Sequence, residues 1–201
     1  MNMVKKLAVA AALVVGTLSA GVASADTITF DNLATGFIAN GYAGFDWNNF
    51  YNTSAPANSG YVGGTVSAPN IAFNAYGNAA SFSKATAFSL DNAFFTGAWN
   101  DGLQIHVVGT GGGNTFTKDF TVNAVSPTQV FFNWSGITSV SFSSSGGVPH
   151  PGYNGAGTHF ALDNLTVNAA PVPEPETYAM MLAGLVALSA VARRRKQAKL
   201  A

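Results

Sequence analysis

The sequence has no cysteine and few charged residues. Without cysteine, a disulfide framework, a cysteine-ligated metal site and a thiol nucleophile are all excluded. Only two of the nine lysines and arginines, Lys84 and Lys118, lie between residues 26 and 172. That central segment also holds seven aspartates, so its formal charge is about −5. A segment with so few cations cannot neutralise a row of phosphates, and we expect no binding to nucleic acid.

Glutamate is also absent from the central segment, which limits its acid–base chemistry. A glycosidase would have to use two aspartates, and no short motif singles out such a pair. The three histidines, His106, His150 and His159, are far apart in the sequence, and no G-x-S-x-G occurs. A serine–histidine–aspartate arrangement stays open in so serine-rich a chain. We predict that the protein is not an enzyme, with an extracellular polysaccharide hydrolase using aspartates as the alternative.

The N-terminus has the three parts of a secretory signal peptide. Lysines at positions 5 and 6 precede an uncharged run over residues 7–18, and small residues lead to Ala23 and Ala25. This order is typical of a signal peptide with an A-x-A cleavage site, and the run is short for a membrane span. We predict a signal peptide over residues 1–25, with cleavage leaving Asp26 first in the mature chain. The alternative is a buried N-terminal helix.

The C-terminus changes composition abruptly at residue 169. Three prolines at positions 171, 173 and 175 exclude regular helix and strand from residues 169–177, which we predict to be an extended linker. Residues 178–192 are 15 uncharged residues, followed by Arg193, Arg194 and Arg195. A helix of that length spans about 22 Å, which is short for a bilayer core of about 30 Å. We predict a marginal hydrophobic helix and basic tail over residues 178–201, with the three arginines as a cytoplasmic membrane stop.

This order of linker, helix and basic cluster resembles the PEP-CTERM sorting signal of Gram-negative bacteria. The resemblance covers about 30 residues. It places Pro173, Glu174 and Pro175 as the recognition triplet, whereas Glu176 and Thr177 stand where a small residue is usual. The resemblance implies that an exosortase processes the chain at the inner membrane, held there transiently by the C-terminal helix. It also implies export to the cell surface or extracellular matrix, and an association with exopolysaccharide and biofilm. The alternative is an ordinary single-pass tail.

Residues 26–168 are predicted to form one all-β domain. Leucine is scarce and no helical period is sustained, whereas phenylalanine, valine, threonine and serine abound. Roughly ten short strands at this spacing favour an antiparallel β-sandwich of jelly-roll type, flanked by the two terminal helices. A glycine-rich turn at residues 109–114 predicts a hairpin joining the strands around Ile105 and Phe120. The predicted strands are Thr27–Asn32, Gly44–Tyr51, Asn70–Ala75, Ala79–Ser83, Ala87–Leu90, Ala93–Trp99, Leu103–Gly109, Thr115–Val122, Gln129–Trp134, Ser139–Ser143 and His159–Val167.

The first and last predicted strands each carry an Asp-Asn pair. If these strands pair, Asp31 and Asp163 come close together and could provide oxygen ligands for Ca²⁺. The alternative is that each carboxylate accepts backbone N–H groups at a turn or strand end. Beyond Asp163 the apolar residues Leu165 and Val167 change parity, so we expect a bulge near Asn164.

The starting ITFDN, the GYAGFDW segment and the final FALDNLTV also resemble carbohydrate-binding β-sandwich ectodomains. Aromatic residues are densest between positions 42 and 51, where Tyr42, Trp47 and Tyr51 are candidates for stacking on sugar rings. We therefore predict a non-catalytic binding or structural module with a polysaccharide as ligand. A matrix protein with a purely structural role is the second alternative.

Overall fold

A computed structural model describes residues 25–168 and residue 184. The predicted sorting triplet, the arginine cluster, residue Ala23 and the rest of both flanking segments lie outside these residues, except for Ala25 and Gly184. Within the described residues no helix has the length and apolar character needed to cross a membrane.

The described chain is dominated by antiparallel β-strands with three single-turn helices. All ten strand pairings are antiparallel in residues 25–168. The elements in chain order are β1 (Asp26–Ile28), β2 (Gly36–Phe37), η1 (Tyr42–Gly44), β3 (Asp46–Asn48), β4 (Phe50–Ser54), α1 (Gly60–Gly64), β5 (Asn70–Asn74), η2 (Ala75–Gly77), β6 (Ala80–Gly97), β7 (Asn100–Asp101), β8 (Leu103–Gly111), β9 (Asn114–Val122), β10 (Thr128–Ser145), β11 (Val148–Pro149) and β12 (Phe160–Val167).

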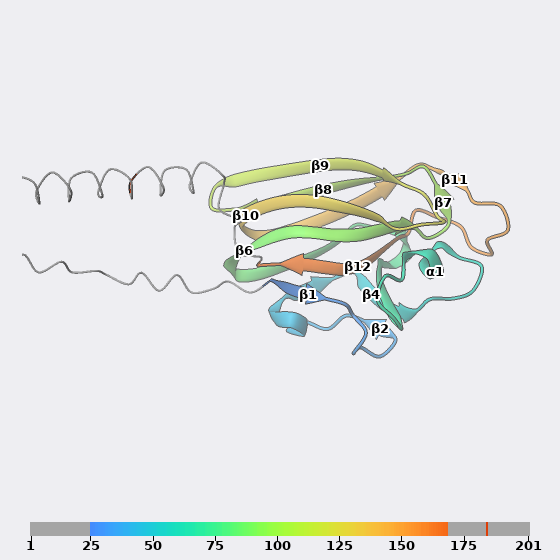
Figure 1. Cartoon of the computed structure of the whole chain (residues 1–201), viewed down its shortest axis with the longest axis horizontal. Coiled ribbons are helices and arrows are strands. Elements are labelled where there is room, and N and C mark those ends of the chain that lie inside the picture. The colour runs from blue at the N-terminus through green and yellow to red at the C-terminus, as the bar shows by residue number, and fades with distance from the viewer. Residues whose placement is uncertain (1–24, 169–183, 185–201) are drawn as a thin grey trace, which may run out of the picture.

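The strands form two layers that share the long strands β6 and β10. One layer, the β8–β9 layer, contains β3, the first part of β6, the second part of β10, β8 and β9. The other, the β4–β5 layer, contains the first part of β10, the second part of β6, β12, β5, β4 and β2. Figure 1 shows β8, β9 and β10 above, β12, β1, β4 and β2 below, and α1, β7 and β11 at one end.

Both shared strands pass between the layers at a local irregularity. In β10 the pairing with β6 shifts register between Phe131 and Ser139. Asn133 and Gly136 have positive φ values of 54° and 71° within that stretch, a backbone conformation that bends a strand at a bulge. The sequence-based prediction placed separate short strands here, and the structure corrects it: three predicted segments form β6 and two form β10. The long strands β6 and β10 continue through the positions at which the prediction separated one short strand from the next.

The two inner faces meet in a core rich in phenylalanine. Phe142 of the β8–β9 layer lies 5.7 Å from Phe50, 6.0 Å from Phe95 and 5.9 Å from Phe160, measured between ring centroids. All four side chains are at most 1% exposed. Full burial of each such ring stabilises the fold by about 1.5–3 kcal/mol, and edge-to-face contacts between rings add to this. The predicted antiparallel β-sandwich is therefore confirmed.

The first and last strands of the domain pair with each other, which is the condition set above for Asp31 and Asp163 to approach. Asp26 is the register partner of Val167, and Ile28 is the partner of Leu165. The predicted bulge is confirmed as well, because Asn164 has a φ of 47° and the β12–β6 register shifts just after Asp163. The bulge lets Phe160, Leu162, Leu165 and Val167 all be buried. The predicted hairpin is also present, with Ile105 opposite Phe120.

Candidate functional site

A row of aromatic side chains crosses the outer face of the β4–β5 layer. Phe37 in β2 is the register partner of Tyr51 in β4, which is the partner of Phe73 in β5. Because neighbouring strands lie about 4.8 Å apart, partners on one face bring their rings into contact. The centroid distances are 5.1 Å from Phe37 to Tyr51 and 5.4 Å from Tyr51 to Phe73. We call Phe37, Tyr51, Phe73 and the neighbouring Tyr76 the aromatic row.

The outer end of the row is open to solvent. Phe37 is 56% exposed and Tyr76 is 76% exposed, and their ring centroids lie 6.4 Å apart. Tyr76 has a φ of 60°, a left-handed conformation that costs a non-glycine residue about 1–2 kcal/mol. The Asn78 N–H donates to the Ala75 carbonyl over 3.1 Å, and this turn holds Tyr76 in the left-handed conformation. A strained residue that presents a large ring to water is a reason to consider a binding role.

The inner end of the row is packed beneath α1. Tyr61 lies 5.1 Å from Phe73 and 5.4 Å from Trp99. The Trp99 Nε1–H group donates to Nδ1 of His159 over 3.2 Å, and the His159 ring is 5.8 Å from Phe73. Burial lowers the pKa of His159, which keeps the ring neutral and able to accept this bond. One end of the row is thereby fixed.

The helix α1 sits so close to β6 because it begins with glycine. A Cβ atom on Gly60 would lie 1.9 Å from the Gly97 carbonyl oxygen, so no other residue fits there without movement. The Gly60 N–H donates to the carbonyl of Ala98 over 2.8 Å and joins the helix to the sheet. This close approach places Tyr61, which is only 4% exposed, against the row.

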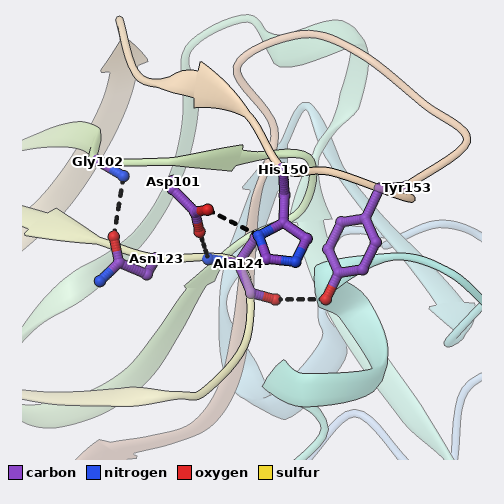
Figure 2. A network of polar contacts seen from close by, with 6 residues as sticks. All are labelled: Asp101, Gly102, Asn123, Ala124, His150 and Tyr153. Atoms are coloured by element: carbon purple, nitrogen blue, oxygen red, sulfur yellow. Dashed lines mark hydrogen bonds and ion pairs between the residues drawn. The ribbon is translucent and has the colours of Figure 1, made fainter.

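A polar network organises the same end of the sandwich (Figure 2). Asp101 accepts from the Ala124 N–H over 2.8 Å and pairs with His150 Nδ1 at 2.7 Å. The Tyr153 hydroxyl donates to the Ala124 carbonyl, and its ring lies 4.4 Å from His150. The Ala124 N–H and, second, the His150 ring hold the pKa of Asp101 below its ordinary value. The backbone N–H of His150 donates to the Trp99 carbonyl over 2.8 Å, so the network also holds the tryptophan beside the row.

This network is compatible with a structural role. A histidine–aspartate pair acts as a general base only if the second ring nitrogen reaches a group to be deprotonated. Among residues 25–168 no serine or threonine hydroxyl is recorded in a hydrogen bond to His150. The contacts that are present join the segment after β11 to the β7–β8 turn and to the segment after β9.

The three predicted ligand residues do not form one surface. Trp47 is 6% exposed, packs in the core, and donates its Nε1–H to the Tyr42 carbonyl over 2.9 Å. Its ring centroid lies 5.4 Å from that of Phe50 and 5.1 Å from that of Phe82. Stacking of Trp47 on a sugar stays a prediction, and it would require the ring to leave this packing. Tyr42 packs partly against the same core, whereas Tyr51 lies in the aromatic row. The three residues lie in different elements, η1, β3 and β4. The chain turns between β3 and β4 at Asn49, whose φ is 57°, and this step puts Trp47 in the core and Tyr51 on the outer face.

The two aspartates predicted as calcium ligands contact opposite ends of one segment. Asp163 accepts from the Val66 and Ser67 N–H groups, the Ser67 hydroxyl and its own neighbour's N–H, over 2.7–3.0 Å. Asp31 accepts from the Asn70 N–H over 3.0 Å. Burial raises the pKa of Asp163, and its four donors oppose that rise. Both carboxylates thus have the alternative role named above, that of accepting backbone N–H groups.

A metal centre has no further support in the described residues. Within residues 25–168 and 184, no three histidine, cysteine, aspartate or glutamate side chains are grouped so that they could hold an ion. Calcium binding by Asp31 and Asp163 stays an untested hypothesis, and it would have to replace hydrogen bonds that both carboxylates already make.

Sequence reasoning missed Phe37, the partner of Tyr51 in the row. Phe37 follows Gly36 in a strand of only two residues, and alternation over so short a strand gives no pattern to read. The available signal was an aromatic residue between Gly36 and Ile38, outside every predicted strand. Its pairing with Tyr51 depends on the register of β2 and β4, which the sequence does not specify.

The C-terminal resemblance is confirmed by comparison with known families. Residues 171–196 match the family model described as the PEP-CTERM protein-sorting motif. This stretch includes the Pro173–Pro175 triplet and the arginine cluster. The motif marks the chain as an exported protein. No curated protein matches the chain.

Several solved structures are similar to the chain at low identity. A DUF4465 family protein from Bacteroides caccae is 15% identical, with a TM-score of 0.47 over 73% of this chain and 100% of that one. The CBM22-1 xylan-binding domain from Paenibacillus barcinonensis is 11% identical, with a TM-score of 0.41 over 74% and 98% of the two chains. TmCBM61, solved in complex with beta-1,4-galactotriose, is 11% identical, with a TM-score of 0.37 over 68% and 100%. Values of this size transfer no ligand or residue role to this chain.

Proposed function

We propose that the protein is a non-catalytic polysaccharide-binding module of the cell surface or extracellular matrix. In this proposal it is exported by its signal peptide, held briefly at the inner membrane and processed by an exosortase near residues 173–177. The observation that carries the binding role is the solvent-exposed pair Phe37 and Tyr76 at the open end of the aromatic row. The observation that supports the route is the sorting motif at residues 171–196.

The chemistry of the row suits a sugar chain. The apolar C–H faces of a pyranose ring pack against aromatic rings, and the Tyr51 and Tyr76 hydroxyls supply polar groups at the ring edges. The four rings follow one another across β2, β4, β5 and η2, so they offer a continuous line of stacking surfaces. Because its inner end is fixed beneath α1, little side-chain freedom is lost there when a ligand binds.

The acidic character of the domain narrows the ligand class. With only Lys84 and Lys118 as strong cations between residues 26 and 172, the domain offers little to attract a polyanion. A neutral polysaccharide avoids both the repulsion and the cost of removing water from charges. An exopolysaccharide of the producing bacterium, as part of a biofilm matrix, fits that description.

A binding assay on the mature protein tests the proposal. We expect the wild-type chain to be retarded in native gels that contain the extracted exopolysaccharide, and the Phe37→Ala/Tyr76→Ala variant to lose at least tenfold in affinity. Two stacking contacts worth about 1 kcal/mol each account for a loss of that size. Phe131→Ala is the matched control, because Phe131 is 53% exposed in β10, at the other edge of the same layer.

Three outcomes would contradict parts of the proposal. If Phe131→Ala weakens binding as much as the double variant does, the row is not the site. If no polysaccharide retards the wild-type protein but deletion of the gene alters the biofilm, a purely structural role replaces binding. If the polymer becomes shorter during incubation and an Asp→Asn change stops this, the protein is a hydrolase.

The processing step has its own test. Mass spectrometry of the protein isolated from its natural host should find a C-terminus near residues 173–177. Recovery of a chain that still ends at Leu200 and Ala201 would overturn processing by an exosortase, whatever the binding assay shows.

A further inference from the structure

A polar groove lies on the outer face of the β8–β9 layer. It has a volume of about 590 Å³, which is within the range of small-ligand sites. Three strands contribute to it in register, since Ser143 of β10 is opposite His106 of β8, which is opposite Asp119 of β9. A second row on the same strands runs from Ser145 through Gln104 to Thr121.

The groove carries hydrogen-bonding groups that have few protein partners. Asp119 Oδ1 lies 2.6 Å from His106 Nδ1, which fixes the orientation of the ring and turns Nε2 away from this contact. Within residues 25–168, no side-chain hydrogen bond is recorded for Gln104, Thr121 or Ser143. These side chains are exposed, so water satisfies them until a ligand replaces it.

The lining indicates a neutral, hydroxyl-rich ligand. The lining side chains include one carboxylate, one imidazole, one carboxamide and several hydroxyls, but no lysine or arginine. Such a surface has no cation to attract an anion. The two apolar residues of the lining, Ile105 and Phe120, pack against the core, so the groove offers little apolar surface to an aliphatic chain. A sugar hydroxyl is both donor and acceptor, and it complements each of these groups. Recognition here depends on hydrogen bonds, in contrast to the stacking expected at the aromatic row.

The groove and the aromatic row lie on opposite sides of the molecule. Each is on the outer face of its own layer, and the core around Phe142 and Phe95 separates the two layers. Packed sheets are about 10 Å apart, so ligand segments approach the two surfaces from opposite directions.

We propose that the groove is a second polysaccharide site, and that the domain bridges two polysaccharide segments. This inference rests on the proposed function, because it takes the aromatic row as the first site. A module with two opposed sites links neighbouring chains of a matrix, and two weak contacts together retain the protein far better than either does alone.

The test measures bridging separately from binding. Beads coated with the extracted exopolysaccharide are mixed with the wild-type protein, and their aggregation is followed by turbidity. We expect aggregation with the wild-type chain and at least a tenfold loss with Gln104→Ala/His106→Ala. The same variant should still be retarded in the native gel, because the aromatic row is intact, and its binding stoichiometry should fall about twofold. Thr115→Ala/Thr117→Ala changes the same face outside the groove and serves as the matched control.

Each result bears on one of the two proposals. Wild-type protein that binds the polysaccharide without aggregating the beads overturns bridging and leaves the proposed function standing. Aggregation by Gln104→Ala/His106→Ala at the wild-type level overturns the groove as the second site. Failure of the wild-type chain to bind at all overturns both proposals. If the double variant melts at a lower temperature than the wild type, the single change Thr121→Ala replaces it, with the same expected loss of aggregation.

Discussion

The two outer faces of the sandwich are built on opposite plans. In β9 of the β8–β9 layer the outward residues Thr115, Thr117, Asp119 and Thr121 are polar and exposed. On the β4–β5 layer the outward residues of β12 include Ala161 and Asp163, which are buried under α1 and the segment that follows it. The side chains of the β8–β9 face therefore interact mainly with water, whereas those of the β4–β5 face beneath α1 are packed against other parts of the protein. A substitution of the same kind should have very different effects on the two faces.

The sharpest test of this difference compares two aspartates. Asp163→Ala leaves four donors at the β4–β5 face without their acceptor, and we expect a loss of about 3–5 kcal/mol in the free energy of unfolding. Asp119→Ala on the other face removes a carboxylate that is 77% exposed, and we expect a change within about 0.5 kcal/mol. Urea denaturation of both variants checks this. Equal losses would remove the distinction between the faces.

A smaller loss is expected from overpacking beneath α1. Gly60→Ala places a Cβ atom 1.9 Å from the Gly97 carbonyl oxygen, which forces the helix away from the sheet. We expect a destabilisation of about 1–3 kcal/mol and weaker polysaccharide binding, since Tyr61 then no longer supports the row. Val62→Ala, at an exposed position of the same helix, is the control and should leave both quantities nearly unchanged. Unchanged binding by Gly60→Ala would show that the row does not depend on α1.

The histidines on the two sides allow a test by pH. Burial lowers the pKa of His159 in the folded state, whereas the unfolded value is about 6.5. The unfolded chain therefore binds more protons between these two values, and stability should fall as the pH falls through about 6.5. Melting temperatures between pH 7.5 and 5.5 measure the effect. His159→Asn, which keeps an acceptor for the Trp99 N–H, should reduce this decline, and His106→Asn on the exposed face should retain it.

The smallest effect concerns calcium. A bound ion would stabilise the fold by mass action, so a chelator would lower the melting temperature. Because both carboxylates already accept N–H groups, we expect the melting temperature to be the same in chelator and in millimolar calcium. A rise with calcium that Asp163→Asn abolishes would restore the metal hypothesis.

Local pattern was sufficient to predict the fold, the hairpin and the bulge. The glycine-rich turn at residues 109–114 predicted the pairing of the strands around Ile105 and Phe120, and the change of parity after Asp163 located the bulge near Asn164. Alternation shows which residues of a strand share a face, but it does not show which strands pair. The positions of the functional side chains depend on that pairing and could not be predicted. Trp47 and Tyr51 are four residues apart, yet the step from β3 to β4 puts one in the core and the other in the row. Predicting the groove would have required the register of β8, β9 and β10. The paired strands β8 and β10 are separated in the sequence by the whole of β9.

The pairing of β1 with β12 also affects how the exported chain can fold. The last strand is an interior one, with β6 on one side and β1 and β5 on the other. The sheet stays incomplete until residue 167 has emerged, so most of the domain must cross the membrane without its final structure. In the folded domain the two ends are adjacent, because Asp26 is the register partner of Val167. Residues 26–168 are therefore suited to insertion as a domain into a single surface loop of another protein.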